Sequence, residues 1–320
     1  MTQRAPAEVL AEAARMAGRA PSALNTQPWR WTLSPDAIDL YADRSRQLTA
    51  ADPDGRMLTV SCGAALHHAR VALAAEGWEA VVERYPEPPD HLARITLGAH
   101  VGVTPEAMRT FQAAEMRHTD RRPVTEDPVD AVVLGEVATA ARAEGVGVHV
   151  LTADQVSELA SAAARADSIA AADPVLRAEL AYWVGGDRPA GTGLPDTVIP
   201  SRPPRTDVPE RDFGAPGTLH VGEGHARTAV YAALFGDTDE PDMWLRGGEA
   251  LSAAWLTAVQ LGLALLPFTA VVEVTTTRQV VRRMLANLGH PYVVFRLGTA
   301  DPEHAGPPHT PRLPTDDVVG

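Results

Sequence analysis

The sequence predicts an α+β fold in which a mixed sheet is flanked by helices. Apolar residues recur at helical spacing in several long runs, and short apolar segments bounded by Gly, Pro, Asn or Asp are typical of strands. The chain also shows one outline twice: a helix, a turn, a strand, a long helix that ends in Gly, and a strand. Residues 57–77 and 241–262 occupy matching places in it. No repeat is visible letter by letter, so the outline alone indicates two halves.

The first half is expected to begin with a helix that stops at Gly18. A second helix is expected from about Met57 to Glu76, because apolar residues fall on one of its faces while His67 and His68 lie elsewhere around it. Gly77 would end that helix as a left-handed cap. Strands are expected at 29–33, 38–41, 80–85 and 93–97.

The second half is expected to begin at Thr104-Pro105-Glu106, which has the order of a helix cap followed by Pro and Glu. From Gly185 to about Gly224 Gly and Pro dominate, and a coil of this length is usually a lid, a binding loop or a disordered segment. The helix expected at 275–289 would point Leu288 inward. The other expected elements are helices at 128–144, across 154–182 and at 241–261, strands at 147–151, 228–235, 265–267 and 292–297, and an extended tail over 306–320.

Composition and charge exclude several function classes. The 320 residues are 45% hydrophobic and 22% charged, as in a globular protein with a sizeable core. A net charge of −13 argues against nucleic acid or a membrane surface as a partner. All 28 basic residues are Arg, which excludes a Walker A loop and Schiff-base chemistry. Cys62 is the only cysteine, so we expect a buried thiol and no intramolecular disulfide.

The N-terminal segment and the other apolar windows are too short or too charged for a signal peptide or a membrane span. The expected location is therefore the cytoplasm. Eleven histidines show no HExxH or Cys/His spacing, so no metal site is predicted. No serine lies in a G-x-S-x-G elbow, and Gly145-Val146-Gly147 lacks a third glycine. Trp183, Trp244 and Trp255 are interpreted as core residues.

The segment RAPSALNTQPWRW, residues 19–31, carries the most specific pattern. Two prolines and short polar side chains lie between a helix and a strand, and Pro28 is expected to push Gln27 towards an extended conformation. A plain helix-to-strand connector would also suit this composition. The order, however, resembles the PSxxNxQPW motif of flavin-dependent nitroreductases, which is matched by Pro21, Ser22, Asn25, Gln27, Pro28 and Trp29.

The resemblance extends to three further segments. Arg117, Thr119 and Arg121 fit the family's R-x-[ST]-x-[RK] motif, which holds the flavin phosphate and ribityl chain. Residues 310–314 fit its [KR]-x-R-x-P segment through Arg312, with Thr310 at the place where a second cation is common. Gly262-Leu263 and the turn Pro267, Phe268, Thr269 and Ala270 are similar to its G-L-x-x-x-P turn at the isoalloxazine.

Arginine suits a phosphate monoester, because its planar guanidinium stays protonated and binds in a bidentate manner. Each charge-assisted contact is worth roughly 1.5–3 kcal/mol. On spacing alone, residues 117–122 could equally form a solvated surface turn paired with Asp120, Glu126 and Asp127. The resemblance predicts a cofactor site at Pro21, Ser22, Ala23, Asn25, Arg117, Thr119, Arg121, Pro267, Phe268, Thr269, Ala270 and Arg312, with no catalytic acid or base among them.

The resemblance also implies an architecture and an activity. It predicts two nitroreductase-like halves in one chain, as in the Acg-like branch of the family, so that a monomer mimics the family's homodimer around one FMN. Residues 1–103 would be a degenerate half that supplies the PSALNTQPW wall, and residues 104–320 the FMN-binding half with a lid at about 185–224. NAD(P)H would pass a hydride to flavin N5, and the flavin would reduce a small-molecule acceptor such as a nitroaromatic or a quinone.

Two other function classes stay open at this point. If residues 185–224 cover the isoalloxazine, the protein would sequester or store flavin with little turnover. A degenerate scaffold without cofactor, using its acidic surface to bind a partner, is the third reading.

Overall fold

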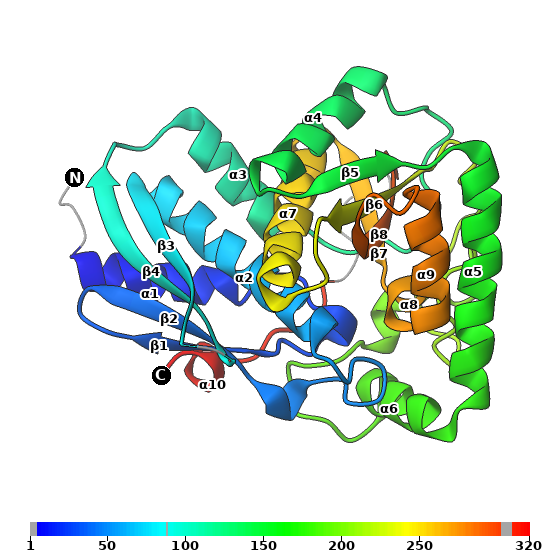
Figure 1. Cartoon of the computed structure of the whole chain (residues 1–320), viewed down its shortest axis with the longest axis horizontal. Coiled ribbons are helices and arrows are strands. Elements are labelled where there is room, and N and C mark those ends of the chain that lie inside the picture. The colour runs from blue at the N-terminus through cyan, green and yellow to red at the C-terminus, as the bar shows by residue number, and fades with distance from the viewer. Residues whose placement is uncertain (1–4, 88, 302–308) are drawn as a thin grey trace.

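The computed structural model describes residues 5–87, 89–301 and 309–320, and it consists of two four-stranded sheets on either side of a central pair of helices (Figure 1). The first sheet has the order β1-β2-β4-β3 and the second the order β5-β6-β8-β7. All neighbouring strands in both sheets are antiparallel. The two sheets therefore have the same strand order, and the α+β prediction is confirmed.

The elements of the first sheet and its helices come first in the chain. They are α1 (Pro6–Ala17), β1 (Trp29–Leu33), β2 (Ala37–Ala42), α2 (Arg56–Ala75), β3 (Trp78–Glu87), β4 (His91–His100) and α3 (Pro105–Met116). Gly77, with φ +82°, follows α2 as the cap that the sequence predicts. The buried thiol of Cys62 on α2 lies 3.2 Å from the carbonyl oxygen of Pro28, as expected for a structural cysteine.

The second sheet and its helices follow. They are α4 (Ala131–Ala143), β5 (Gly147–Val150), α5 (Ala153–Ala172), α6 (Pro174–Gly185), β6 (Val230–Gly236), α7 (Pro241–Gln260), β7 (Leu263–Phe268), α8 (Ala270–Glu273), α9 (Thr275–Met284), β8 (His290–Thr299) and α10 (Thr315–Val318). Residues 306–308 of the predicted tail lie outside the described residues.

Helices α2 and α7 pack against each other along the middle of the molecule, and each is 20 residues long (Figure 1). Along the chain, each helix occupies the same place among the strands of its own sheet: α2 lies between β2 and β3, and α7 lies between β6 and β7. The hydrophobic clusters cross this interface: Leu245 of α7 belongs to the cluster of the first sheet, and Met57 of α2 to that of the second. The two halves thus share one interior.

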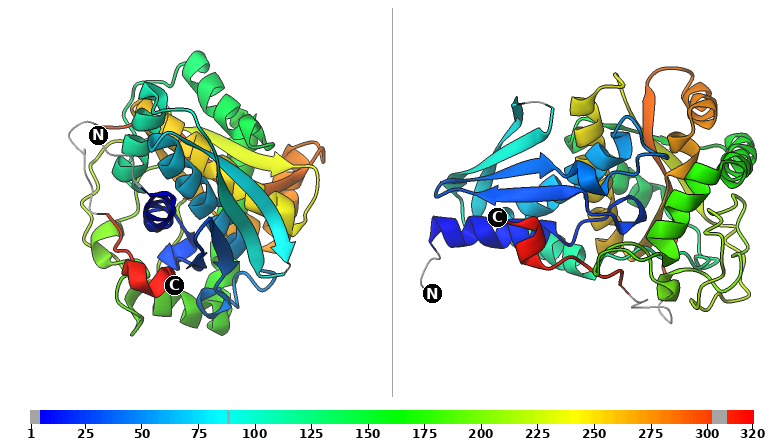
Figure 2. Two further views of the ribbon diagram at one scale, coloured as in Figure 1. Left: turned by 90° about the vertical axis from the view of Figure 1, so that its left-hand side faces the viewer. Right: turned by 90° about the horizontal axis from the view of Figure 1, so that it is seen from below.

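The C-terminal segment returns to the first sheet (Figure 2). Val319 forms a parallel bridge with Trp31 of β1, and Gly320 exchanges backbone hydrogen bonds of 2.9 Å with Trp31 and Leu33. Val318 is buried in the first hydrophobic cluster. The last residues of the chain are thus held beside the segment that carries the PSALNTQPW motif. Among the described residues, no helix is long and apolar enough to cross a membrane.

Two local expectations are wrong. Gln27 has φ +50° rather than an extended conformation, because its side chain is held between two other segments of the chain. Leu288 is 78% exposed, since α9 ends at Met284 and the positive φ of Ala286 and Asn287 turns the chain away. His67 and His68, which the sequence places away from the apolar face of α2, are nevertheless buried, because α7 covers that side of α2.

Candidate functional site

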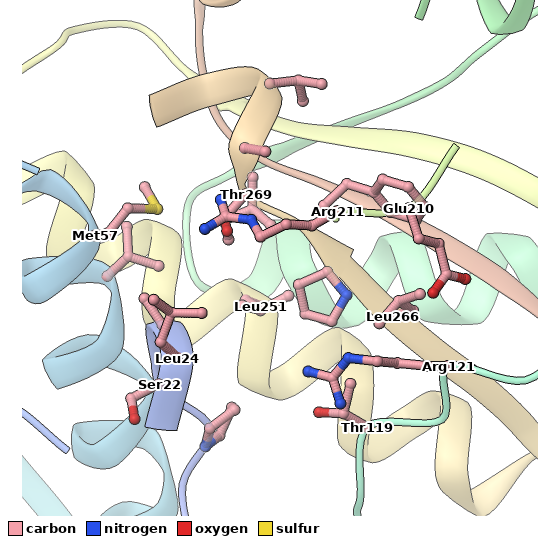
Figure 3. A pocket seen from close by; sticks show the side chains of 18 of the residues that line it. Ser22, Leu24, Met57, Thr119, Arg121, Glu210, Arg211, Leu251, Leu266 and Thr269 are labelled. Atoms are coloured by element: carbon pink, nitrogen blue, oxygen red, sulfur yellow. The ribbon is translucent and has the colours of Figure 1, made fainter. Parts of the chain in front are cut away.

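A cavity lies between the two halves, next to the central helix pair (Figure 3). Its empty space is about 1000 Å³, a figure that includes solvent-open space at its mouth. Nine of the twelve predicted site residues line it: Pro21, Ser22, Ala23, Thr119, Arg121, Pro267, Phe268, Thr269 and Ala270. Three segments that are distant in the sequence thus meet at one cavity, as the motifs predict.

The cavity has a floor of apolar side chains that the motifs do not indicate. Met57 and Val60 come from α2, Leu251 and Trp255 from α7, and Leu266 from β7. All five are buried side chains of the shared interior. A planar apolar ring could pack on such a surface with little loss of hydration. Of these five, Trp255 is predicted from the sequence as a core residue, since helical periodicity cannot distinguish a side chain that faces another helix from one that faces a cavity.

Ser22 and Ala23 form the wall contributed by the first half. The Ser22 hydroxyl accepts a 2.9 Å hydrogen bond from the Gln27 backbone N–H, and the Ala23 N–H donates to Ser61 of α2 at 3.2 Å. Leu24 has φ +46°, an uncommon conformation for a branched residue. The loop is therefore fixed by its own side chains and by α2, which holds its backbone against the cavity.

Thr119 and Arg121 form the opposite wall, and Arg121 extends its guanidinium group into the cavity (Figure 3). Its Nη1 donates a 3.1 Å hydrogen bond to the Val198 carbonyl, and the ring of Phe213 lies 5.4 Å from its guanidinium carbon. Burial lowers the pKa of Arg121 to about 10, although the charge of Glu210 acts in the opposite direction. An anionic or electron-rich ligand would stabilise this partly desolvated charge.

The alternative of a solvated surface turn at residues 117–122 is wrong, because Arg117, Asp120 and Arg122 are all buried. Asp120 forms a bidentate pair with Arg122 at 2.9 and 3.0 Å. Neither Arg117 nor Arg121 forms an ion pair with Glu126 or Asp127 in the described part of the chain. The two arginines of the predicted motif therefore keep their charges for another partner.

Arg117, Arg312 and Asn25, the remaining predicted residues, lie beside this cavity and not in its lining. Arg117 is 4% exposed, its guanidinium carbon lies 4.6 Å from the ring of Trp255, and its Nη2 donates to the Arg19 carbonyl at 3.0 Å. Burial and then the charge of Arg312 lower the pKa of Arg117 to about 9. Trp255, predicted as core, is both buried and the surface on which this arginine stacks.

Arg312 reaches the same place from the C-terminal segment. Its Nη1 donates to Asn25 Oδ1 at 3.1 Å and to Thr310 Oγ1 at 2.6 Å, and its Nη2 donates to the Arg19 carbonyl at 3.1 Å. Arg117 and Arg312 line a second cleft, together with Arg15, Arg19 and His309. The structure therefore brings Arg117, Arg312 and Asn25 together, at the edge of the main cavity.

Asn25 and Gln27 hold three segments together. Asn25 Nδ2 donates to the carbonyl oxygens of Gly193 at 3.1 Å and Pro311 at 2.9 Å. Gln27 Nε2 donates to Gly191 at 2.7 Å, and its Oε1 accepts from the Leu313 N–H at 3.0 Å. Both side chains are buried. Within this structure Asn25 thus acts as a clamp on the 185–224 segment and the C-terminal segment, not as part of the cavity surface.

The Gly/Pro-rich segment contributes residues 209–211 and 213 to the cavity wall. Arg211 points into the cavity near Thr269 (Figure 3) and pairs with Glu273 at 2.5 Å. Leu194, Val198 and Ile199 form a small apolar cluster with Phe213 and Leu24 packed against it. The segment therefore packs over the cavity next to the loop from the first half.

Two carboxyl groups also line the cavity, and the motifs do not indicate either of them. Burial raises the pKa of Asp167 to about 6, against the lowering effect of Arg211. Burial also raises the pKa of Glu210, which accepts a 2.6 Å hydrogen bond from Arg296. Neither residue belongs to a cluster of metal-ligand type in the parts of the chain that the structure describes.

The chain is similar over almost its whole length to proteins of Mycobacterium tuberculosis (strain ATCC 25618 / H37Rv). It is 37% identical to one with the provisional name NAD(P)H nitroreductase Rv3131, over 98% of this chain and 91% of that protein. It is 35% identical to one with the provisional name NAD(P)H nitroreductase acg, over 97% of this chain and 95% of that protein.

Among solved structures, the FMN and NADPH-dependent nitroreductase NfnB from sphigopyxis sp. strain HMH is 19% identical, covers 66% of this chain and 97% of its own, and has a TM-score of 0.41. The chain matches no protein-family model. Identity above one third over nearly the full length of both chains establishes common ancestry with the mycobacterial proteins, and the chain therefore belongs to the NAD(P)H nitroreductase family, in the branch that contains Acg.

Proposed function

We propose that this protein is an NAD(P)H-dependent oxidoreductase that binds one FMN between its two halves and reduces a small electron acceptor such as a nitroaromatic or a quinone. The observation that carries the proposal is the meeting of the first-half wall at Ser22 with Arg121 and with the turn at Thr269 around one apolar cavity. The relatives' names point in the same direction.

The residues present fit FMN in their chemistry. The apolar floor would accept the isoalloxazine ring system, and Arg121 and Thr119 would contact its polar chain. Arg117 and Arg312 would hold the phosphate, because each is a buried or half-buried guanidinium without a carboxylate partner among the described residues. The Nε atoms of both arginines are buried and make no hydrogen bond. An anion at this place would supply the missing acceptors.

Bound FMN would supply the redox chemistry, and the protein's own residues would bind and orient it and limit access. No acid or base of this chain is needed to anchor the cofactor. We also propose that residues 1–103 and 104–320 correspond to the two halves of a pseudo-dimer, which the shared strand order and the matching places of α2 and α7 support. One polypeptide would then hold one complete site.

A second function is favoured by the position of the 185–224 segment. Because residues 209–211 and 213 line the cavity, this segment would cover a bound flavin and could exclude the nicotinamide ring. The protein would then bind FMN tightly and turn over slowly, as a flavin-sequestering protein. Here residues 185–224 act as a lid, and the two functions differ only in whether this lid admits a reductant.

Anaerobic reduction of the FMN-loaded protein separates these functions. If the protein is an oxidoreductase, the flavin absorbance near 450 nm should bleach with NADH or NADPH and return when a quinone is added. Dithionite but not NAD(P)H should bleach the flavin of a sequestering protein. A protein that binds no FMN after incubation with excess cofactor would contradict both functions and support a cofactor-free scaffold.

A further inference from the structure

Three guanidinium groups converge on the second cleft, and the one carboxylate among the cleft's lining residues, Glu115, forms no ion pair with any of them in the described part of the chain. Arg19, Arg117 and Arg312 all line it, and no ion pair involving any of them is found within the described residues. Arg15 also lines the cleft, but it forms an ion pair with Glu12. In a chain with a net charge of −13, a concentration of unmatched positive charge needs a physical reason.

Arg19 is tied to the other two arginines through its own backbone. Its carbonyl oxygen accepts hydrogen bonds from Arg117 Nη2 at 3.0 Å and from Arg312 Nη2 at 3.1 Å, so the three residues form one unit. The Arg19 side chain itself is exposed, and its charge, after burial, lowers the pKa of Arg312 to about 10. The three cations therefore repel one another, and this repulsion would be relieved by an anion between them.

The three arginines come from both halves of the chain. Arg19 precedes the PSALN loop in the first half, whereas Arg117 and Arg312 come from the second half and the C-terminal segment. Neighbouring Thr310 is neutral and already accepts a hydrogen bond from Arg312 at 2.6 Å. Among the described residues that are hydrogen-bonded to Arg117 or Arg312, Arg19 is therefore the one that can supply a third positive charge.

We propose that Arg19 is a further anion-binding residue of this protein, which acts together with Arg117 and Arg312 on the terminal phosphate of the flavin. The inference rests on the proposed function, since it takes the ligand to be FMN. The phosphate is a dianion near neutral pH with several acceptor oxygens, which matches three guanidinium groups better than one or two. The 2′-phosphate of NADPH has the same chemistry, and the test below separates the two.

The primary experiment measures binding and not turnover. FMN and riboflavin, which lacks the phosphate, are titrated by fluorescence into apoprotein of the parent chain and of Arg19→Ala, Arg19→Lys, Arg117→Ala and Arg142→Ala. Arg142 is an exposed arginine of α4 that lines neither cavity, so it is the matched control. Arg19→Ala should weaken FMN binding by roughly three- to tenfold, because an exposed charge is worth less than a buried one.

The same variant should leave the affinity for riboflavin unchanged, and Arg19→Lys should recover most of the loss. An equal loss for FMN and riboflavin would show that Arg19 acts on the loop structure and would overturn the proposal. Unchanged FMN binding in Arg19→Ala, with weaker binding in Arg117→Ala, would overturn it too while the proposed function stands. If neither arginine affected FMN binding, the arginine cluster would not be the phosphate site and the proposal would be overturned, whereas the proposed function fails only if the parent chain binds no FMN.

A second measurement is thermal unfolding of the apoprotein, because loss of Arg19 should weaken ligand binding but should not lower the melting temperature of the ligand-free protein. Removing one of three repelling charges should leave the melting temperature of apo Arg19→Ala equal or higher, while stabilisation by inorganic phosphate becomes smaller. A lower apo melting temperature with an unchanged phosphate effect would contradict the proposal. If the anion were NADPH, the FMN affinity would stay constant and Arg19→Ala would instead raise the KM for NADPH but not for NADH, which also overturns the assignment to flavin.

Discussion

Gly63 of α2 and Gly248 of α7 make the same contact in opposite directions. A Cβ atom on Gly63 would overlap the carbonyl oxygen of Leu245, and one on Gly248 would overlap the carbonyl oxygen of Val60. In each case the partner lies three residues before the other glycine. Reciprocity of this kind is the signature of a two-fold interface, here between two helices of one chain. It supports the pseudo-dimer proposal more directly than any sequence pattern.

We predict that Gly63→Ala and Gly248→Ala each lower the free energy of unfolding by about 1–3 kcal/mol, because the added methyl groups push two packed backbones apart. Chemical denaturation monitored by circular dichroism measures this. Gly135→Ala is the control, since Gly135 lies in α4 with nothing near its Cβ position, and alanine should stabilise that helix by up to about 1 kcal/mol. Equal effects at all three positions would contradict close packing of α2 and α7.

We expect Arg312→Ala to weaken FMN binding by roughly one to two decades, through loss of a charge-assisted contact to phosphate. Because Arg312 also bonds to Asn25, a titration with riboflavin serves as the control for structural damage. Riboflavin affinity should change much less than FMN affinity. An FMN affinity equal to that of the parent protein would remove Arg312 from the site.

Replacing Ser22 and Asn25 together by alanine should change the absorbance spectrum of bound flavin, although both lie far from Arg117 in the sequence. Ser22 lines the cavity, and Asn25 ties the lid at Gly193 to the segment at Pro311. Limited proteolysis should also cut residues 185–224 faster in Asn25→Ala than in the parent chain. An unchanged spectrum would argue against a flavin that spans the two halves.

The stability of the protein should fall between about pH 4 and pH 7, in part because of Asp52. Burial raises the pKa of this carboxyl from 3.8 to about 6, so its ionisation is less favourable in the folded state than in the unfolded state. Below pH 4 the group is neutral in both states, and as the pH rises through 6 the folded protein loses up to about 3 kcal/mol relative to the unfolded chain.

Asp52→Asn should therefore reduce this decline, since asparagine does not titrate and keeps an oxygen to accept the 2.8 Å hydrogen bond from the Leu58 N–H. Urea unfolding at several pH values measures the effect. Asp36→Asn, at an exposed turn, should leave the pH dependence as it is in the parent. The same slope for Asp52→Asn as for the parent would show that Asp52 keeps an ordinary pKa.

Phe213→Ala should increase the rate of NAD(P)H oxidation if the lid limits access. The Phe213 ring lines the cavity and lies against the guanidinium group of Arg121, so its removal opens the entrance next to a proposed flavin contact. Stopped-flow measurement of flavin reduction should show a severalfold faster reductive step with little change in FMN affinity. Slower reduction would indicate that Phe213 positions the ring and does not block it.

The sequence predicted most elements because local signals agree along much of the chain. The long helices, their Gly caps and the short strands all follow from periodicity and turn residues. It failed where a distant segment decides the local conformation. Gln27 takes a positive φ because the 185–224 segment and the C-terminal segment bond to its side chain, and no neighbour in the sequence indicates that.

For the site, four short motifs name segments that the structure brings close together, and their role in binding FMN stays a prediction. Nine of the twelve residues line one cavity, and the other three lie together at its edge. The sequence by itself thus determined the fold class and the family. Only the tertiary structure decided that Arg19 joins the arginine cluster, that Trp255 supports Arg117, and that Asn25 bonds to both the 185–224 segment and the C-terminal segment. Contacts between segments more than 90 residues apart depend on how α2 and α7 pack, and packing leaves no local pattern in a sequence.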